Sequence, residues 1–404
     1  MLRSVAVSHS LPARKGFPGS SWSATQSQRQ PGADAGFLPD HRPVGPLSAG
    51  PDVILPYPGP DSGMEITSWY HNGTMGTEPK LYQGAKCDLQ PSRRRAPWWM
   101  KAGIQLVLAH IPFGERINHQ LQIWNGFHRH LPPQARNNID HLCSISRACS
   151  RFGTNLEGAR VLEVGTGWTP TLPVGMYLLG AEVHTFDHVA HVRGEMLDAL
   201  FKVYESEIPR ISAECGKDIA LLESRLARLR QAEIRRSIRE WLLPFNIHYY
   251  APGDATQSGL KADSLDLYFS VAVLEHVPED VVGKILREAY RTLKAGALTY
   301  HHIGLFDHYT SVDPAITQVN FLKFRDSTWH VIGQNRVQFH NRLRKSEFLK
   351  MFREAGFEIL ECAFEVDKRS LEALPALRLN QRYRSFDPKD LAASVATICA
   401  RKPF

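Results

Sequence analysis

Three carboxylates each stand at the end of a short apolar run or just beyond it. Glu163 lies in the run Arg160–Val164, Asp187 directly follows Glu182–Phe186, and Asp254 comes shortly after Ile247–Tyr250. If the runs are parallel strands, their carboxyl ends meet at one edge of a sheet, where ligands of such folds bind. Carboxylates accept hydrogen bonds from hydroxyl and amino groups and attract cations. The pattern therefore predicts one site for a ligand with such groups.

A glycine-containing turn follows the first run. Gly165 and Gly167 flank Thr166, and glycines at these places permit a tight bend and a close approach of the backbone to a ligand. Thr169 is predicted to cap a helix that begins at Pro170, whose free amides would face the same ligand. The third glycine of the dinucleotide fingerprint is absent, because Thr169 and Pro170 stand in that region. A plain tight turn is the alternative interpretation.

The three acids differ in what they would bind. Asp187 lies 22 residues after Gly165, a spacing at which an acid accepts hydrogen bonds from both ribose hydroxyls. Glu163 would repel a pyrophosphate but attract the amino or sulfonium group of a cationic cofactor, which favours S-adenosylmethionine (SAM) over NAD. Asp254 can accept from an adenine amino group while the Ala255 amide bonds a ring nitrogen. For Asp187 a surface position, and for Asp254 a simple turn, remain the alternatives.

A fourth apolar run, Leu265–Phe269, leads into the sequence Ser270-Val-Ala-Val-Leu-Glu-His-Val277. With the motifs above, the chain resembles class I, seven-strand SAM-dependent methyltransferases over about Arg160 to Arg401, and most of all the broad group with an "S-x-x-x-LEHV" signature. The resemblance implies SAM as cofactor. The methionine end of SAM would lie at the glycine turn and its methyl group near the fourth strand. Its ribose would bind Asp187 and its adenine Asp254. The implied cofactor-binding residues are Glu163, Gly165, Thr166, Gly167, Asp187, Asp254, Ala255 and Ser270.

Histidines dominate the predicted acceptor side. His276 follows the fourth strand, and an imidazole with an ordinary pKa of about 6.5 suits a base that deprotonates a hydroxyl acceptor. Packing beneath the sheet is the alternative for His276. His302, at the end of the fifth strand, and His308, in the polar stretch that follows it, are further catalytic candidates. We expect no metal site, because His301 and His302 are adjacent on a strand and so point to opposite faces.

The pattern of the chain predicts a doubly wound α/β fold with a seven-stranded, mostly parallel sheet whose last strand is antiparallel. Short apolar runs alternate with amphipathic ones from Gly158 onward, which is typical of such sheets. The three remaining predicted strands are Ala297–Ile303, Phe357–Phe364 and Ala393–Ala400. Residues 158–404 would form the methyltransferase domain, with insertions at 193–243 and 304–345 that build the substrate pocket.

The chain before this domain divides into two parts. Residues 1–97 hold 13 of the 26 prolines and are expected to be disordered or loosely ordered. Residues 1–33 carry Arg and Lys but no acid, which resembles an organellar targeting segment. The alternatives are a dispensable tail and an over-long start, with Met64 as a later candidate for the first residue. Residues 98–157 are predicted to form a helical cap of three stretches, 98–111, 117–130 and 138–152, separated by the breaks at Pro112–Gly114 and Pro132-Pro133.

Composition and motifs indicate which classes of partner and which location to expect. The net charge of +7 is modest and no basic stripe is present, and the fourth strand lacks the Asp/Asn-Pro-Pro-aromatic run of nucleic-acid amine methyltransferases. Nucleic acid is therefore not expected as a partner. The six cysteines form no CxxC pair, and no apolar run reaches the roughly 18 residues that span a bilayer, so we expect a cytoplasmic protein. The oligomeric state is not predicted.

The function predicted from these observations is methyl transfer from SAM to a small-molecule or saccharide acceptor, with a hydroxyl as the first choice and N- or C-methylation left open. Two alternatives share the fold. One is aminopropyl transfer from decarboxylated SAM, which would require an acidic polyamine pocket. The other is a non-catalytic SAM-binding or scaffold protein.

Overall fold

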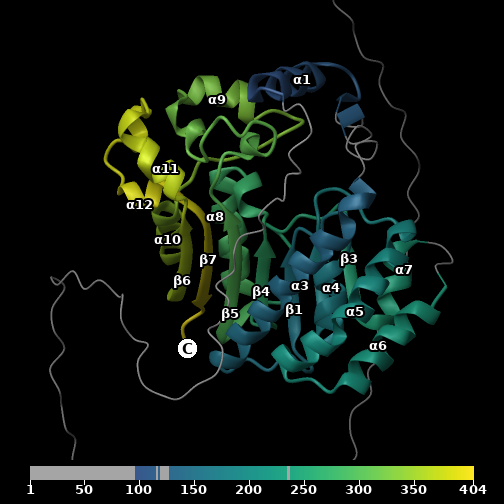
Figure 1. Ribbon diagram of the computed structural model, residues 1–404. Coiled ribbons are helices and arrows are strands. Elements are labelled where there is room, and N and C mark those ends of the chain that lie inside the picture. Colours follow the sequence, from purple (N-terminus) through teal and green to yellow (C-terminus); the bar gives the residue numbers. More distant parts are fainter. Residues whose placement is uncertain (1–95, 115–116, 119–126, 234–236) are drawn as a thin grey trace, which may run out of the picture. The chain divides into compact units, whose positions relative to one another are not determined.

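The computed structural model describes residues 96–114, 117–118, 127–233 and 237–404. Nearly all of the predicted N-terminal segment and most of the predicted helical stretch 117–130 lie outside these ranges. The described strands form one seven-stranded sheet (Figure 1). They are β1 Arg160–Val164, β2 Glu182–Phe186, β3 Ile247–Tyr250, β4 Leu265–Val271, β5 Leu293–Gly304, β6 Glu358–Val366 and β7 Ala393–Arg401.

The strand order is β3-β2-β1-β4-β5-β7-β6. β1 pairs in parallel with β2 and β4, and the parallel pairing extends to β3 on one side and β5 on the other. β7 is antiparallel to both β5 and β6. The predicted fold class is confirmed. The chain reverses its winding between β1 and β4, and in open α/β sheets such a switch point is where ligands bind.

Helices cover both faces of this sheet. They include α3 Phe127–Arg151, α4 Thr171–Leu178, α5 Leu197–Cys215, α6 Ile219–Gln231, α8 Glu279–Thr292 and α10 Lys345–Glu354. The other described helices are α1 Trp98–His110, α7 Ile238–Leu242, α9 Asp326–Gly333, α11 Lys368–Ala373 and α12 Pro388–Leu391.

Two core clusters show how the helices divide between the faces. On one face, side chains such as Val161 and Val183 pack with apolar residues of α3, α4, α5 and α6. On the other, Leu162 and Tyr268 pack with residues of α8 and α10. Successive strand residues alternate between the faces, as the period of two requires. The sheet is therefore buried on both sides, and its carboxyl edge is the place where loops can meet a ligand.

The first predicted insertion forms α5, α6 and α7. The second forms α9 and two 3-10 turns, His308–Ser311 and Asn320–Lys323. A third core cluster joins this second insertion to α1 and to the region of α11 and α12. Within it Trp329, Phe321 and Tyr383 are buried. α1 contacts α9, so the first predicted helical stretch packs on the second insertion.

α3 departs from the prediction at Pro132-Pro133. Instead of breaking there, the helix begins at Phe127 and continues to Arg151 with both prolines inside it. The prolines are the sixth and seventh residues of this 25-residue helix, beyond the first four positions whose N–H groups lack partners, so each removes one helical hydrogen bond. The remaining turns are held by tertiary packing, since Ile139 and Leu142 are buried in the first core cluster.

No helix among the described residues is both long and apolar enough to span a membrane.

Candidate active site

The turn after β1 depends on its two glycines. Gly165 and Gly167 have φ values of +87° and +69°, a region that residues with a side chain rarely adopt. A Cβ on Gly165 would also lie 2.3 Å from Cγ2 of Val273, in the loop that follows β4. Gly165 donates its N–H to the carbonyl of Phe186 at 2.7 Å. The glycine turn is thereby fixed against the ends of both β2 and β4.

The helix after this turn begins one residue later than predicted. α4 starts at Thr171, and Pro170 occupies the N-cap position with φ −78° and ψ 47°, outside the helical region. The Thr169 hydroxyl is hydrogen-bonded to the Thr171 hydroxyl at 3.0 Å and caps no amide of α4, which has no side-chain cap. The turn still delivers a helix N-terminus to the carboxyl edge of the sheet.

Asp187 joins the end of β2 to the glycine turn. Its Oδ2 accepts the Gly167 N–H at 2.8 Å, and its Oδ1 accepts the Val189 N–H at 3.1 Å. A carboxylate has about four acceptor sites, so these two bonds leave capacity for ligand hydroxyls. The structure thus brings Asp187 and the glycine turn together, as the spacing predicted.

Glu163 is fully buried at the end of β1. Its Oε2 accepts the hydroxyl of Thr185 at 2.5 Å, and Thr185 is hydrogen-bonded in turn to the Thr166 hydroxyl at 2.5 Å. Burial, and then the negative charge of Asp187, raise the pKa of Glu163 to about 8, although the Thr185 bond opposes this. A cation placed beside Glu163 would restore the ionised form.

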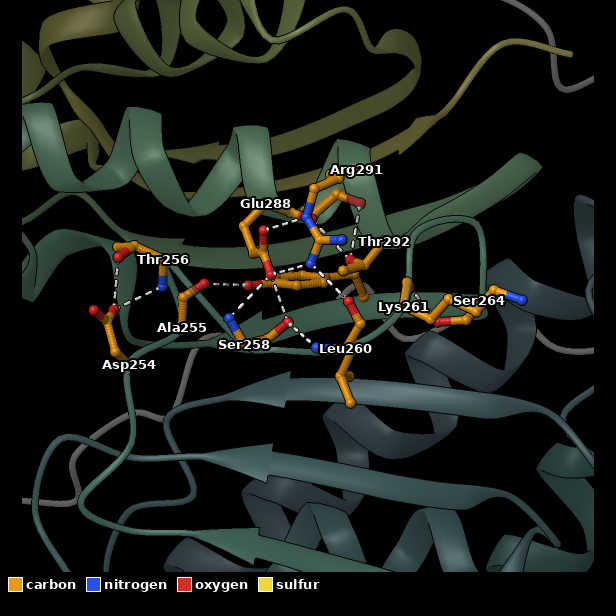
Figure 2. Close-up of polar contacts among 12 residues, drawn as sticks. Asp254, Ala255, Thr256, Ser258, Leu260, Lys261, Ser264, Glu288, Arg291 and Thr292 are labelled. Atoms are coloured by element: carbon orange, nitrogen blue, oxygen red, sulfur yellow. Dashed lines mark hydrogen bonds and ion pairs between the residues drawn. The ribbon is translucent and has the colours of Figure 1, made fainter. Parts of the chain in front are cut away.

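Asp254 lies in the loop between β3 and β4 (Figure 2). Its Oδ1 accepts the Thr256 N–H at 2.8 Å and the Thr256 hydroxyl at 2.7 Å, and these bonds lower the pKa of the exposed carboxylate. The neighbouring Gly253 donates its N–H to the carbonyl of Asp187 at 2.8 Å. The second and third predicted acids therefore lie on loops that are bonded to each other.

Glu288 of α8 holds the rest of this loop (Figure 2). Its Oε1 accepts both the N–H of Ser258, at 2.9 Å, and the Ser258 hydroxyl, at 2.5 Å. Arg291 binds Glu288 and also donates to the carbonyl of Leu260 at 2.8 Å. Ala255 accepts a longer bond from the Tyr268 hydroxyl, at 3.4 Å. Hydrogen bonds to residues of α8 and β4 thus hold the predicted adenine-binding segment in place.

Ser270 points into the core. It is completely buried, and its hydroxyl is hydrogen-bonded to Nδ1 of His301 at 2.7 Å. The His301 ring packs on Phe352 of α10 at 5.2 Å. The Ser270 side chain is therefore engaged away from the glycine turn, and its contact with the donor stays a prediction.

The predicted histidines separate into two groups. His302 faces α3, where its ring lies 4.3 Å from His141 and its Nδ1 lies 2.9 Å from the Thr397 hydroxyl. Burial lowers the pKa of His302 to about 4. Since His301 packs on α10, the two neighbours face opposite layers, as predicted. His276 and His308 form the second group, with ring centroids 4.9 Å apart.

This second group gathers where the chain leaves β4 and β5. His276 ends the 3-10 turn Leu274–His276 and is exposed, and its Nδ1 lies 2.9 Å from the carbonyl of Phe339. The buried His340 stacks on His308 with ring centroids 4.1 Å apart and an angle of 8°. Burial lowers the pKa of His308 to about 3, so its ring is neutral at neutral pH. The arrangement presents neutral imidazoles beside an exposed one.

Sequence reasoning missed several residues of this edge. Thr185 links Glu163 to Thr166, and nothing in a strand sequence marks a threonine for such a role. Asn341 is another residue to which sequence reasoning assigns no role. Its side chain donates to the carbonyls of Leu274 and Val277 at 2.7 and 2.9 Å and so fixes the turn that carries His276. Glu275 is buried within that turn, and its place in the LEHV signature was the available signal.

Comparison with protein families finds one match. A family model described as a methyltransferase domain matches residues 216–300, which include β3, β4 and most of β5. No curated protein matches the sequence. The family match supports the enzyme class predicted from the sequence: residues 216–300 are similar to part of a methyltransferase domain.

Solved structures with detectable likeness include three methyltransferases. A putative methyltransferase from Bacillus halodurans C-125 is 17% identical, with 65% of this chain and 100% of that chain covered and a TM-score of 0.34. Phosphoethanolamine N-methyltransferase 2 of Haemonchus contortus is 17% identical over 65% of this chain and 53% of its own, with a TM-score of 0.35. Magnesium protoporphyrin IX methyltransferase of Synechocystis PCC 6803 is 14% identical over 65% and 82%, with a TM-score of 0.36. The match thus spans about half the length of the Haemonchus enzyme.

Proposed function

We propose that the chain transfers a methyl group from SAM to a hydroxyl oxygen of a small-molecule or saccharide acceptor. The observation that carries the proposal is the arrangement of the carboxyl edge. The glycine turn and Asp187 occupy the ends of β1 and β2, and His276 and His308 occupy the segments after β4 and β5. The switch point of the sheet lies between them.

On the donor side, we assign Asp187 to the ribose and the loop of Asp254 and Ala255 to the adenine. Glu163, buried behind the glycine turn, would face the positive charge of the methionine end. Two observations support this assignment: the Asp187 carboxylate already accepts the Gly167 amide, and the loop of Asp254 is bonded to the main chain of Asp187. The resemblance to the group with the LEHV signature favours the same distribution of roles.

On the acceptor side, the transfer is an in-line displacement at the methyl carbon. The acceptor oxygen forms the new bond, the sulfonium sulfur keeps the electron pair of the broken bond, and the hydroxyl proton must leave. The enzyme therefore has to align the two molecules and assist removal of that proton. His276 is the exposed member of its histidine group, and we assign the assistance to it, with His308 beside it. His302, packed between β7 and α3, would line the other wall of the acceptor pocket.

A methyl-transfer screen tests the proposal. The full chain would be incubated with SAM carrying a labelled methyl group and with cell extract separated into glycan, lipid and small-molecule fractions. We expect label in a glycan or small-molecule fraction, released as an ether-linked methyl group, and a loss of at least about tenfold in the rate for His276→Gln.

The alternatives predict different results. Incorporation that requires decarboxylated SAM and delivers an aminopropyl group would establish the aminopropyl transferase. Tight SAM binding without label in any fraction would favour the non-catalytic protein. Label on nitrogen or carbon would contradict the hydroxyl acceptor while leaving the enzyme class intact.

A further inference from the structure

Glu275, His276 and His308 form a group of possible metal ligands at the carboxyl edge of the sheet. One carboxylate oxygen and one nitrogen from each imidazole all lie within 4.8 Å of one another. Two of the residues come from the turn after β4 and the third from the segment after β5. Donor atoms around a tetrahedral zinc ion are about 3.4 Å apart, so side-chain movements of about 1 Å would close the group on an ion.

Glu275 supplies the main reason to expect an ion. Its Oε1 accepts the Gly304 N–H at 3.0 Å, whereas its Oε2 is buried and has no hydrogen-bond partner among the described residues. A buried, unpartnered carboxylate oxygen is costly unless a cation or a donor meets it. Gly304 also permits the approach of the carboxylate, because a Cβ there would lie 2.8 Å from Oε1. The fold thus places Glu275 close to His276 and His308, with its carboxylate Oε2 unpartnered among the described residues.

His276 is oriented as a ligand. The Phe339 carbonyl can only accept, so the 2.9 Å contact places the proton of His276 on Nδ1 and leaves the lone pair on Nε2. A metal-binding histidine usually donates its other ring N–H to a carbonyl or carboxylate in this way, which fixes the tautomer and the ring direction. Asn341 fixes the same turn through its bonds to Leu274 and Val277.

Stacked aromatic rings fix the position of the His308 side chain. His340 stacks on it in parallel, and the His340 ring is itself stacked on Phe321 at 5.3 Å. The nearby Arg342 and Arg344 donate to the carbonyls of Phe321 and Leu305, at 3.0 and 2.6 Å. The two guanidinium groups are thus bonded to backbone oxygens, and Arg342 also to the carboxylate of Asp326.

We propose that Glu275, His276 and His308 bind one divalent cation of the zinc type. Two imidazoles and one carboxylate suit zinc and its first-row neighbours better than calcium or magnesium, which prefer oxygen ligands. Three protein ligands leave a fourth position open. The sequence-based expectation of no metal site considered His301 and His302, which the sheet separates, and did not join Glu275 to His308.

The role of the ion rests on the proposed function. An acceptor hydroxyl at the open position would have its pKa lowered by the cation, as a zinc-bound water does. The hydroxyl proton would pass to a solvent water, and His276 would assist its removal as a ligand of the ion, because the lone pair of its Nε2 would be bound to the metal. The ion would also place the acceptor oxygen beside the segment that follows β4.

A second group offers a matched control. Glu182, His184 and His248 also lie within 4.8 Å by their ligand atoms, but there the carboxylate Oε1 already accepts bonds from Arg160 at 3.1 and 3.2 Å. The positive charge of Arg160 thus stabilises the Glu182 carboxylate, as a bound cation would stabilise the carboxylate of Glu275. We therefore expect no ion at this second group.

The test is a titration with Co²⁺, whose visible absorption bands report its ligands. The full chain would be freed of metal with a chelator and titrated in the absence of SAM. We expect one equivalent of Co²⁺ to bind and Zn²⁺ to displace it. Glu275→Gln and His308→Gln should each weaken binding by more than about tenfold, while His248→Gln should bind as the unaltered chain does. Far-ultraviolet circular dichroism would verify that each variant is folded.

SAM binding by the same samples separates the two proposals. If Co²⁺ fails to bind, or if Glu275→Gln and His308→Gln leave its affinity unchanged, the metal site is wrong even where SAM still binds. Loss of Co²⁺ binding in His248→Gln alone would move the site to the second group and also overturn the proposal. Absence of SAM binding in the unaltered chain would instead count against the proposed function.

Discussion

Glu163 is a carboxyl group that the fold has taken out of water without giving it a positive partner. It is fully buried and bonded to Thr185, and its pKa is raised to about 8. At neutral pH the unliganded protein therefore holds a proton there that the unfolded chain has lost. The free energy of unfolding should fall as the pH rises from about 4.5, the ordinary pKa, to about 8.

Glu163→Gln should remove this pH dependence, because glutamine keeps an acceptor for Thr185 and cannot ionise. Between pH 5 and pH 8 the unaltered chain should lose about 2 to 4 kcal/mol of unfolding free energy relative to the variant, at about 1.4 kcal/mol per pKa unit. Urea denaturation at intervals of one pH unit measures the difference.

Glu157→Gln serves as the control for this measurement. Hydrogen bonds from Arg225 and Lys217 lower the pKa of the exposed Glu157 carboxylate, so it stays ionised in both states throughout pH 5 to 8. The difference between this variant and the unaltered chain should be constant over that range. A Glu163→Gln curve parallel to that of the unaltered chain would show that Glu163 is not a buried acid.

At the residue scale, the sequence predicted where some of the candidate side chains lie but not all their partners. Asp187 was predictable, because its spacing from Gly165 reflects the geometry of two adjacent parallel strands. The engagement of Ser270 with His301 was not, since it depends on the register of β4 against β5, which pairs these two residues. Glu275 needed the contact with Gly304, which a single sequence does not reveal.

At the scale of elements, the strands were predicted to within a few residues because each is a short apolar run between polar segments. The continuous α3 was missed at Pro132-Pro133, because tertiary packing can outweigh a local helix breaker. The glycine turn is the element on which the site depends most. It needs both a positive φ at Gly165 and space beside Val273.

Gly165→Ala should therefore lower the unfolding free energy and weaken SAM binding. The backbone strain alone costs about 1 to 2 kcal/mol, and the contact with Val273 adds to it. Gly153→Ala is the matched control, since Gly153 has a φ of +85° and open space at its Cβ position.

Chemical denaturation and SAM titration of both variants make the comparison. We expect Gly165→Ala to be the less stable by about 1 to 3 kcal/mol, with part of that loss recovered by adding Val273→Ala. Equal stability of the two glycine variants would mean that the turn does not pack on the loop after β4.

At the scale of the whole molecule, the sheet places the proposed donor side and the proposed acceptor side at one edge. α8 anchors the loop of Asp254, and the second insertion carries His308 and His340. The sequence predicted this division because insertions after strands are visible as breaks in the alternating pattern. It could not show that α1 packs on the second insertion, since that contact joins segments about 220 residues apart.

Calorimetric titration tests whether this edge of the sheet binds SAM, with two matched aspartates. Asp187 accepts the Gly167 amide at the carboxyl edge, and Asp266 accepts the Arg160 amide at 2.9 Å at the start of β4, away from that edge. We predict one SAM per unaltered chain, binding weakened about 10- to 100-fold in Asp187→Asn, and unchanged binding in Asp266→Asn. No binding by the unaltered chain, or equal affinities in the unaltered chain and Asp187→Asn, would contradict the account.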